Sequence, residues 1–164
     1  VFAFLKRMNE YTEVSHTTGN LELDADSEKS SKDNEEETLE LPDSVEVYEI
    51  RGPFFFGVAN KFDEKMRQVG EHHKIRIIRM RKVPFIDSTG LNNLELLCRN
   101  SRKEKIIVIL SGVRESVREQ INKTRIPEII GEDNICSNIQ LAVKKAIEID
   151  TELKKKNRLK KVLQ

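Results

Sequence analysis

The chain has 164 residues, of which 37% are hydrophobic and 35% are charged, and its formal net charge is +1. This length suits one ordinary domain with tails, and the low apolar fraction indicates that part of the chain is solvated. No run reaches the ~20 apolar residues that a membrane span requires. The spacing of Cys98 and Cys136 fits neither a zinc site nor a disulfide framework, so we expect two reduced thiols and no metal site.

The first 14 residues have the pattern of a short amphipathic helix. Residues 1–5 are apolar, and Lys6 and Arg7 follow them directly. This pattern fits an ordinary helical turn, and it also fits the last turn of a membrane helix with its basic flank on the cytoplasmic side.

Charge is unevenly distributed along the chain. Residues 22–40 contain nine acidic residues and two lysines, and residues 144–161 contain eight basic and three acidic residues. Because the acidic stretch can bury little apolar surface, we expect residues 15–38 to form a disordered linker. The ordered domain is predicted to span residues 39–150, and a basic tail spans 151–164.

Within the ordered region, strand patterns alternate with helix patterns. Strands are predicted at 39–41, 45–50, 75–78, 106–110 and 135–136, and helices at 60–69, 88–101, 114–123 and from 137 or 138 onward. The continuous apolar run at 106–110 is typical of a central strand buried on both faces. The alternation predicts an α/β fold in which a four- to five-stranded, mainly parallel sheet carries about four helices.

The turn from strand to helix at residues 87–90 reads Asp-Ser-Thr-Gly. Asp87 or Ser88 occupies the position of a helix N-cap, and Gly90 permits a tight turn. The same geometry makes Ser88 a candidate phosphoacceptor, because the helix dipole stabilises a dianion there, with Thr89 as the second choice. Ser88 is a poor candidate nucleophile, since the G-x-S-x-G pattern is absent and no histidine is obviously placed as its base. We therefore expect no enzymatic activity.

Two further clusters carry functional hypotheses. Three consecutive aromatic residues cannot all face one core, so the segment from Pro53 through Phe54, Phe55 and Phe56 is partly structural and partly a candidate docking surface. Basic side chains line the strand that precedes Ser88. A solvated strand face is their default role, but their place at the carboxyl end of a parallel strand makes three of them candidate anion or nucleotide contacts. These three are Arg79, Arg81 and Lys82.

No Walker-type phosphate loop is present, so nucleotide binding has little support and no cofactor is expected. The run of lysines and arginines from Lys154 to Lys161 suits a solvated helix end and could also contact anionic lipid. Nucleic acid is an unlikely partner, because the folded region lacks a broad basic surface with interleaved aromatic residues.

The order of elements, with Asp-Ser-Thr-Gly between the strand at 75–78 and the next helix, resembles the STAS domain. That domain occurs in bacterial anti-sigma factor antagonists and at the cytoplasmic ends of SulP-family anion transporters. The stretches at 48–57 (YEIRGPFFFG) and 78–90 (IRMRKVPFIDSTG) resemble the transporter branch, and the resemblance covers about residues 40–150.

The resemblance implies that residues 1–14 are the end of the last membrane span and its juxtamembrane stretch. It further implies a regulatory or interaction domain at the cytoplasmic face of the plasma membrane, bound to its own membrane domain and to regulatory proteins. The transported ion would be sulfate or another inorganic anion. Some relatives bind guanine nucleotides, and a partner kinase phosphorylates the matching serine in the antagonist branch. The alternatives are a stand-alone antagonist regulated at Ser88 and a small α/β enzyme.

Overall fold

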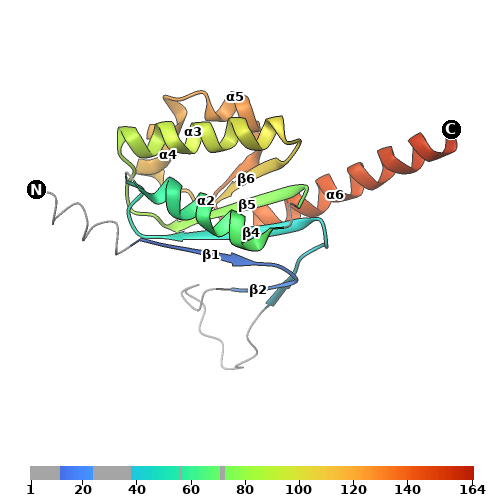
Figure 1. Ribbon diagram of the computed structural model, residues 1–164, viewed down its shortest axis with the longest axis horizontal. Coiled ribbons are helices and arrows are strands. Elements are labelled where there is room, and N and C mark those ends of the chain that lie inside the picture. Colours follow the sequence, from blue (N-terminus) through green and yellow to red (C-terminus); the bar gives the residue numbers. More distant parts are fainter. Residues whose placement is uncertain (1–11, 24–37, 56, 71–72) are drawn as a thin grey trace, which may run out of the picture.

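The computed structural model describes residues 12–23, 38–55, 57–70 and 73–164 (Figure 1). Its main sheet has five strands in the order β1-β4-β5-β6-β7. The strands are β1 (Glu13–Thr17), β4 (Val45–Arg51), β5 (Ile75–Lys82), β6 (Ile107–Ser111) and β7 (Ile135–Cys136). All neighbouring pairs are parallel except β1 with β4. The predicted α/β class with a mixed, mainly parallel sheet is confirmed.

Five α-helices occur in the described residues, where the sequence predicts about four. They are α2 (Val58–Val69), α3 (Ser88–Lys103), α4 (Glu115–Asn122), α5 (Ile126–Ile130) and α6 (Ile139–Val162), with a 3₁₀ turn η1 (Glu132–Asn134) after α5. The additional helix is the short α5. Pro127 occupies its first turn, where the missing N–H of proline has no helical partner to lose.

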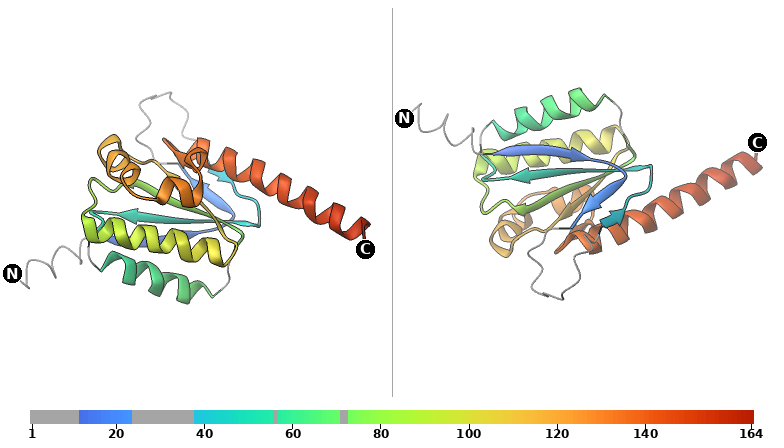
Figure 2. Two further views of the ribbon diagram at one scale, coloured as in Figure 1. Left: turned by 90° about the horizontal axis from the view of Figure 1, so that it is seen from above. Right: turned by 90° about the horizontal axis from the view of Figure 1, so that it is seen from below.

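The helices divide the core into two clusters on opposite faces of the sheet. Side chains from α2, α3, α4 and α5 bury one face, whereas α6 buries the other. Figure 2 shows this arrangement from above and below, with the C-terminal half of α6 extending beyond the sheet. The run predicted as a central strand is β6, and its Val108 and Ile109 belong to opposite clusters, as burial on both faces requires.

The ordered region begins earlier in the chain than the sequence predicts. Residues 13–17 form the edge strand β1, and β2 (Asn20–Glu22) pairs with β3 (Thr38–Glu40) in a separate two-stranded sheet. A helix over 13–14 and a disordered linker over 15–22 are therefore wrong. The stretch at 13–17 carries one apolar residue, Val14, so its pattern is weak, and hydrogen bonds to β4 determine its structure.

The remaining parts of the first two predicted segments, residues 1–11 and 24–37, lie outside the described residues. Within the stretches that the structure covers, no helix is both long enough and apolar enough to cross a bilayer.

Candidate functional site

The turn before α3 is a well-formed helix N-terminus. Asp87 has an extended backbone and is the N-cap, and its carboxylate accepts a hydrogen bond from the Gly90 N–H at 2.6 Å. Its carbonyl oxygen accepts the first helical bond, from Leu91 N–H at 2.8 Å. Of the two residues predicted as possible caps, Asp87 is the N-cap, and Ser88 is the first helical residue. This local geometry follows from an Asp side chain short enough to reach the free N–H groups of the first turn.

Gly90 is needed for close packing. A Cβ atom placed on it would lie 2.2 Å from the carbonyl oxygen of Phe54 and 3.0 Å from Cγ1 of Ile86. The segment that carries Phe54 is held there by hydrogen bonds in both directions, from Phe54 N–H to Phe85 O at 3.0 Å and from Asp87 N–H to Phe54 O at 3.4 Å. The glycine thus lets the loop after β4 lie directly against the first turn of α3.

Ser88 and Thr89 are exposed at this helix end, whereas Asp87 is half-buried. The described histidines, His16 and His73, lie near the N-terminal ends of the parallel strands, and Ser88 follows the C-terminal end of β5. Neither of them is placed to act as a base for Ser88. The third histidine, His72, lies outside the described residues.

The aromatic segment divides between core and surface. Phe54 is completely buried, so its inclusion in a docking surface is wrong, and the inward direction of its side chain explains why. Pro53 and Phe55 are half-buried, and Phe56 lies outside the described residues. Phe85, which was not predicted as part of a docking surface, is 47% exposed and meets the Phe55 ring edge-on, with 4.8 Å between ring centroids.

Together, Phe55, Phe85, Ser88 and Thr89 form what we call the α3-cap surface. Phe85, which packs against Phe55, precedes the two hydroxyl residues by a few positions in the chain, and the hydroxyl residues lie at the positive end of a 16-residue helix. Phe85 follows Pro84 in the short connection between β5 and α3, and an aromatic residue directly after a proline in a connecting loop was the available signal.

The arginines of β5 are not a solvated face, which corrects the default interpretation of this strand. Arg76 and Arg79 are 2% and 3% exposed. Arg76 Nε donates to Glu46 Oε1 at 3.0 Å, and Arg79 Nη1 lies 3.4 Å from Glu49 Oε2. The acidic partners are on the neighbouring strand β4. Alternation alone cannot indicate that these charges are buried, because burial depends on pairing between strands.

Arg79 and Arg81 nevertheless line a shared pocket of about 370 Å³ at the carboxyl edge of the sheet. Ser111, Arg114 and the first residues of α6 complete its wall, and the buried Ser111 Oγ has no hydrogen-bond partner. Lys82 is exposed and is not part of this lining. Ser88 is not part of it either.

The basic tail is the second half of α6. Its cationic residues are exposed, as are Leu159 and Val162, which are 63% and 81% exposed. Lys154 pairs with Asp150 at 2.8 Å, where the helix leaves the sheet. The cationic residues of this stretch are Lys154, Lys155, Lys156, Arg158, Lys160 and Lys161.

Comparison with known proteins identifies the class. Residues 38–146 match the family model described as the STAS domain. The chain belongs to this family, in agreement with its fold and with the Asp-Ser-Thr-Gly turn. No curated protein matches the chain significantly.

Two bacterial crystal structures specify the branch that this domain resembles. The chain is 36% identical to a sulfate transporter family protein from Wolinella succinogenes, with a TM-score of 0.63, and the match covers 68% of this chain and 91% of that one. It is 34% identical to the SulP transporter STAS domain from Vibrio cholerae, with a TM-score of 0.60, and the match covers 68% and 88% of the two chains. This is a STAS domain that resembles those of SulP transporters.

A third match places the fold within a larger protein. The murine anion transporter Slc26a9, in its inward-facing state, matches with a TM-score of 0.63 over 90% of this chain. The identity is 18%, and the match covers 24% of the transporter, so this comparison supports the fold alone.

Proposed function

We propose that the chain is the regulatory and interaction domain of a SulP-type anion transporter, located at the cytoplasmic face of the membrane. The observation that carries this proposal is the match to the Wolinella protein over nearly all of that protein's length. The transported substrate is sulfate or another inorganic anion, bound by membrane helices and not by this domain. The role of the domain is interaction, without catalysis.

The α3-cap surface is the proposed contact with the membrane domain or with a regulatory protein. An exposed aromatic ring (Phe85) and a half-buried one (Phe55) near two exposed hydroxyl residues suit a protein interface, because such a surface can bury apolar area and retain polar contacts. Phosphorylation of Ser88 would add about −1.5 to −2 charges at this surface. The α3 N-terminus would stabilise that charge within the domain, while the Asp87 carboxylate beside it is already engaged with Gly90. Phosphorylation of Ser88 would thereby alter a contact that the unmodified α3-cap surface forms.

The test uses the full-length transporter in membrane vesicles, with uptake of labelled sulfate as the readout. Ser88→Glu is compared with Ser88→Ala and with Ser116→Glu, which introduces the same charge at an exposed position in the first turn of α4. We expect Ser88→Glu to change uptake by about fivefold or more, which is the lower range of typical coupling between sites. Ser116→Glu should leave uptake unchanged. Equal effects of the two glutamates, or no effect of either, would refute the switch at Ser88.

The alternative is a stand-alone anti-sigma factor antagonist. The exposure of Ser88 at a helix N-terminus favours it, since a kinase could reach the hydroxyl. Recovery of the native gene product in the membrane fraction of lysed cells supports the transporter. A freely soluble gene product that binds a kinase-type partner supports the antagonist.

Two lesser contacts belong to the same proposal. The 370 Å³ pocket beside Arg79 and Arg81 suits a small oxyanion, because the unpartnered Ser111 hydroxyl and the α6 N-terminus both offer donors. Titration calorimetry with sulfate, phosphate and a guanine nucleotide tests it, with Arg114→Ala as the variant that should weaken binding.

The basic half of α6 is proposed to contact anionic lipid. Cosedimentation with phosphatidylserine vesicles should disappear when residues 154–164 are removed.

A further inference from the structure

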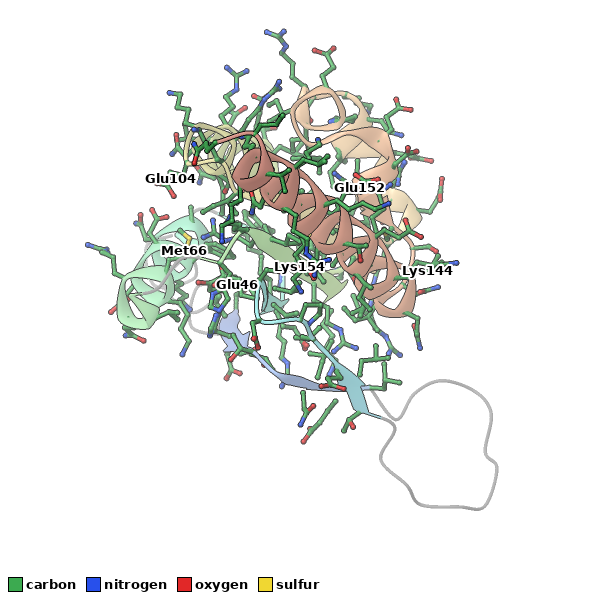
Figure 3. All side chains as sticks on the ribbon, turned by 90° about the vertical axis from the view of Figure 1, so that its right-hand side faces the viewer. Glu46, Met66, Glu104, Lys144, Glu152 and Lys154 are labelled. Carbon is green, nitrogen blue, oxygen red and sulfur yellow. The ribbon has the colours of Figure 1, made fainter. Side chains whose placement is uncertain are left out.

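A cluster of two histidines and one glutamate lies at the edge of the sheet opposite to the α3-cap surface. His16 Nε2 lies 3.1 Å from Glu46 Oε2, and His73 Nδ1 lies 3.2 Å from the same oxygen. Each residue comes from a different segment: β1, β4 and the chain just before β5. Figure 3 labels Glu46 at the end of the molecule from which α6 extends toward the viewer.

We propose that His16, Glu46 and His73 form a binding site for a divalent transition-metal ion of the Zn²⁺ type. The three donor atoms lie within 4.8 Å of one another. In a tetrahedral site with metal–ligand distances near 2.0–2.1 Å, two ligand atoms are about 3.4 Å apart. The two distances to Glu46 are therefore close to those of a metal-bound site, and only the histidine nitrogens must approach each other.

The donor types determine which metal fits. Two imidazole nitrogens with one carboxylate oxygen favour Zn²⁺, Co²⁺, Ni²⁺ or Cu²⁺, whereas Mg²⁺ and Ca²⁺ prefer all-oxygen sites. Three protein ligands leave one tetrahedral position open to water or to a further ligand. The histidine side chains are 13% and 18% exposed while Glu46 is fully buried, so an ion enters from the histidine side.

The surrounding side chains hold the ligands in place. Arg76 Nε donates to Oε1 of Glu46, which leaves Oε2 directed at the two histidines. The Tyr48 ring contacts His16, with 4.8 Å between ring centroids, and Arg76 lies 5.5 Å from the centroid of Tyr48. Such supporting contacts orient metal ligands. Because Arg76 already balances the Glu46 charge, we expect micromolar affinity, below that of a structural zinc site.

A bound ion would join β1 to the centre of the sheet. β1 is an edge strand of the described sheet, and its strand partner there is β4, with which it pairs antiparallel. The ion adds a cross-link from β1 to β4 and to the start of β5. The segment that enters the domain at its N-terminal side thereby becomes fixed in a metal-dependent manner.

The experiment measures metal binding by the 164-residue chain after removal of metal with a chelator. Zn²⁺ affinity is measured by competition with a chromophoric chelator, and Co²⁺ coordination by its visible absorption. The variants His16→Gln and His73→Asn place an amide near the coordinating nitrogen. They keep a hydrogen-bond donor to Glu46 but remove the imidazole ligand. Glu49→Gln is the matched control, since Glu49 is a carboxylate on the same strand that pairs with Arg79 and, among the described residues, has no histidine partner.

We expect the wild-type chain and Glu49→Gln to bind one Zn²⁺ per chain and to show the intense absorption of tetrahedral Co²⁺. Each histidine variant should bind at least about tenfold more weakly. At Zn²⁺ concentrations 100 times the Kd, the folding equilibrium constant of the wild type should rise about 100-fold. Absence of micromolar binding by the wild type, or unchanged affinity in folded His16→Gln and His73→Asn, would overturn the proposal.

Discussion

Replacing Gly90 with alanine gives a direct test of how the α3-cap turn is built. Two physical effects of this substitution have opposite signs. Alanine is the better helix former, and this effect alone would stabilise the domain by up to about 1 kcal/mol. The added methyl group, however, would lie 2.2 Å from Phe54 O and 2.9 Å from Phe54 Cδ1.

The structure indicates which effect is larger. The closest atom is a backbone oxygen, and its segment is held by hydrogen bonds with Phe85 and Asp87. Since this backbone cannot move aside like the end of a flexible side chain, we assign the overpacking cost to the upper end of its usual range, about 3 kcal/mol. After subtraction of the helix-propensity gain, the expected net destabilisation is about 2 kcal/mol.

Urea denaturation followed by circular dichroism measures this effect. With an m-value of about 2 kcal/mol per M, the midpoint should fall by about 1 M. Thr89→Ala is the control, because Thr89 is exposed in the same helical turn and its replacement should change stability by less than about 0.5 kcal/mol. A Gly90→Ala protein as stable as the wild type, or more stable, would show that close packing does not govern this turn.

Two other predictions concern titratable groups away from this turn. Burial alone would raise the pKa of Asp150, but hydrogen bonds from Lys154 and Ser44 and the charge of Lys154 lower it below its ordinary value. The carboxylate therefore stabilises the fold above the unfolded pKa of about 4, and this stability is lost as the pH falls through the folded pKa. Asp150→Asn should be less stable than wild type at pH 7, by a margin that shrinks toward pH 3 in urea titrations. A margin independent of pH, or an equal loss in the Glu148→Gln control, would contradict this. Burial, followed by the nearby Glu95 charge, raises the pKa of Cys98 to about 12. In a Cys136→Ser background, a thiol reagent at pH 8 should react with Cys98 only as fast as the protein unfolds, and rapid labelling of the native state would refute this.

The sequence predicted most of the sheet because β4, β5 and β6 each carry a local pattern of apolar residues. The runs at β5 and β6 and the helical spacing of α2 and α3 are local patterns, and the structure confirms them. The Asp87 cap was predictable for the same reason, because a side chain three residues from its N–H partner acts within one turn.

β1 shows where local patterns fail. Its five residues, Glu-Val-Ser-His-Thr, have little apolar content, and they form a strand because β4 offers an unpaired edge 30 residues later. The same holds for the buried arginines. Nothing near Arg76 in the sequence indicates that Glu46, on the adjacent strand, forms an ion pair with it inside the domain.

The sequence by itself thus determined the class of fold, the family and a helix start at Asp87 or Ser88, since each depends on residues close together in the chain. The tertiary structure decided that Phe54 is core while Phe85 is surface and that Gly90 supports a backbone contact. It also decided that His16, Glu46 and His73 share one site. These features depend on segments brought together by strand pairing and packing, and the spacing of residues along the chain does not specify which faces will meet.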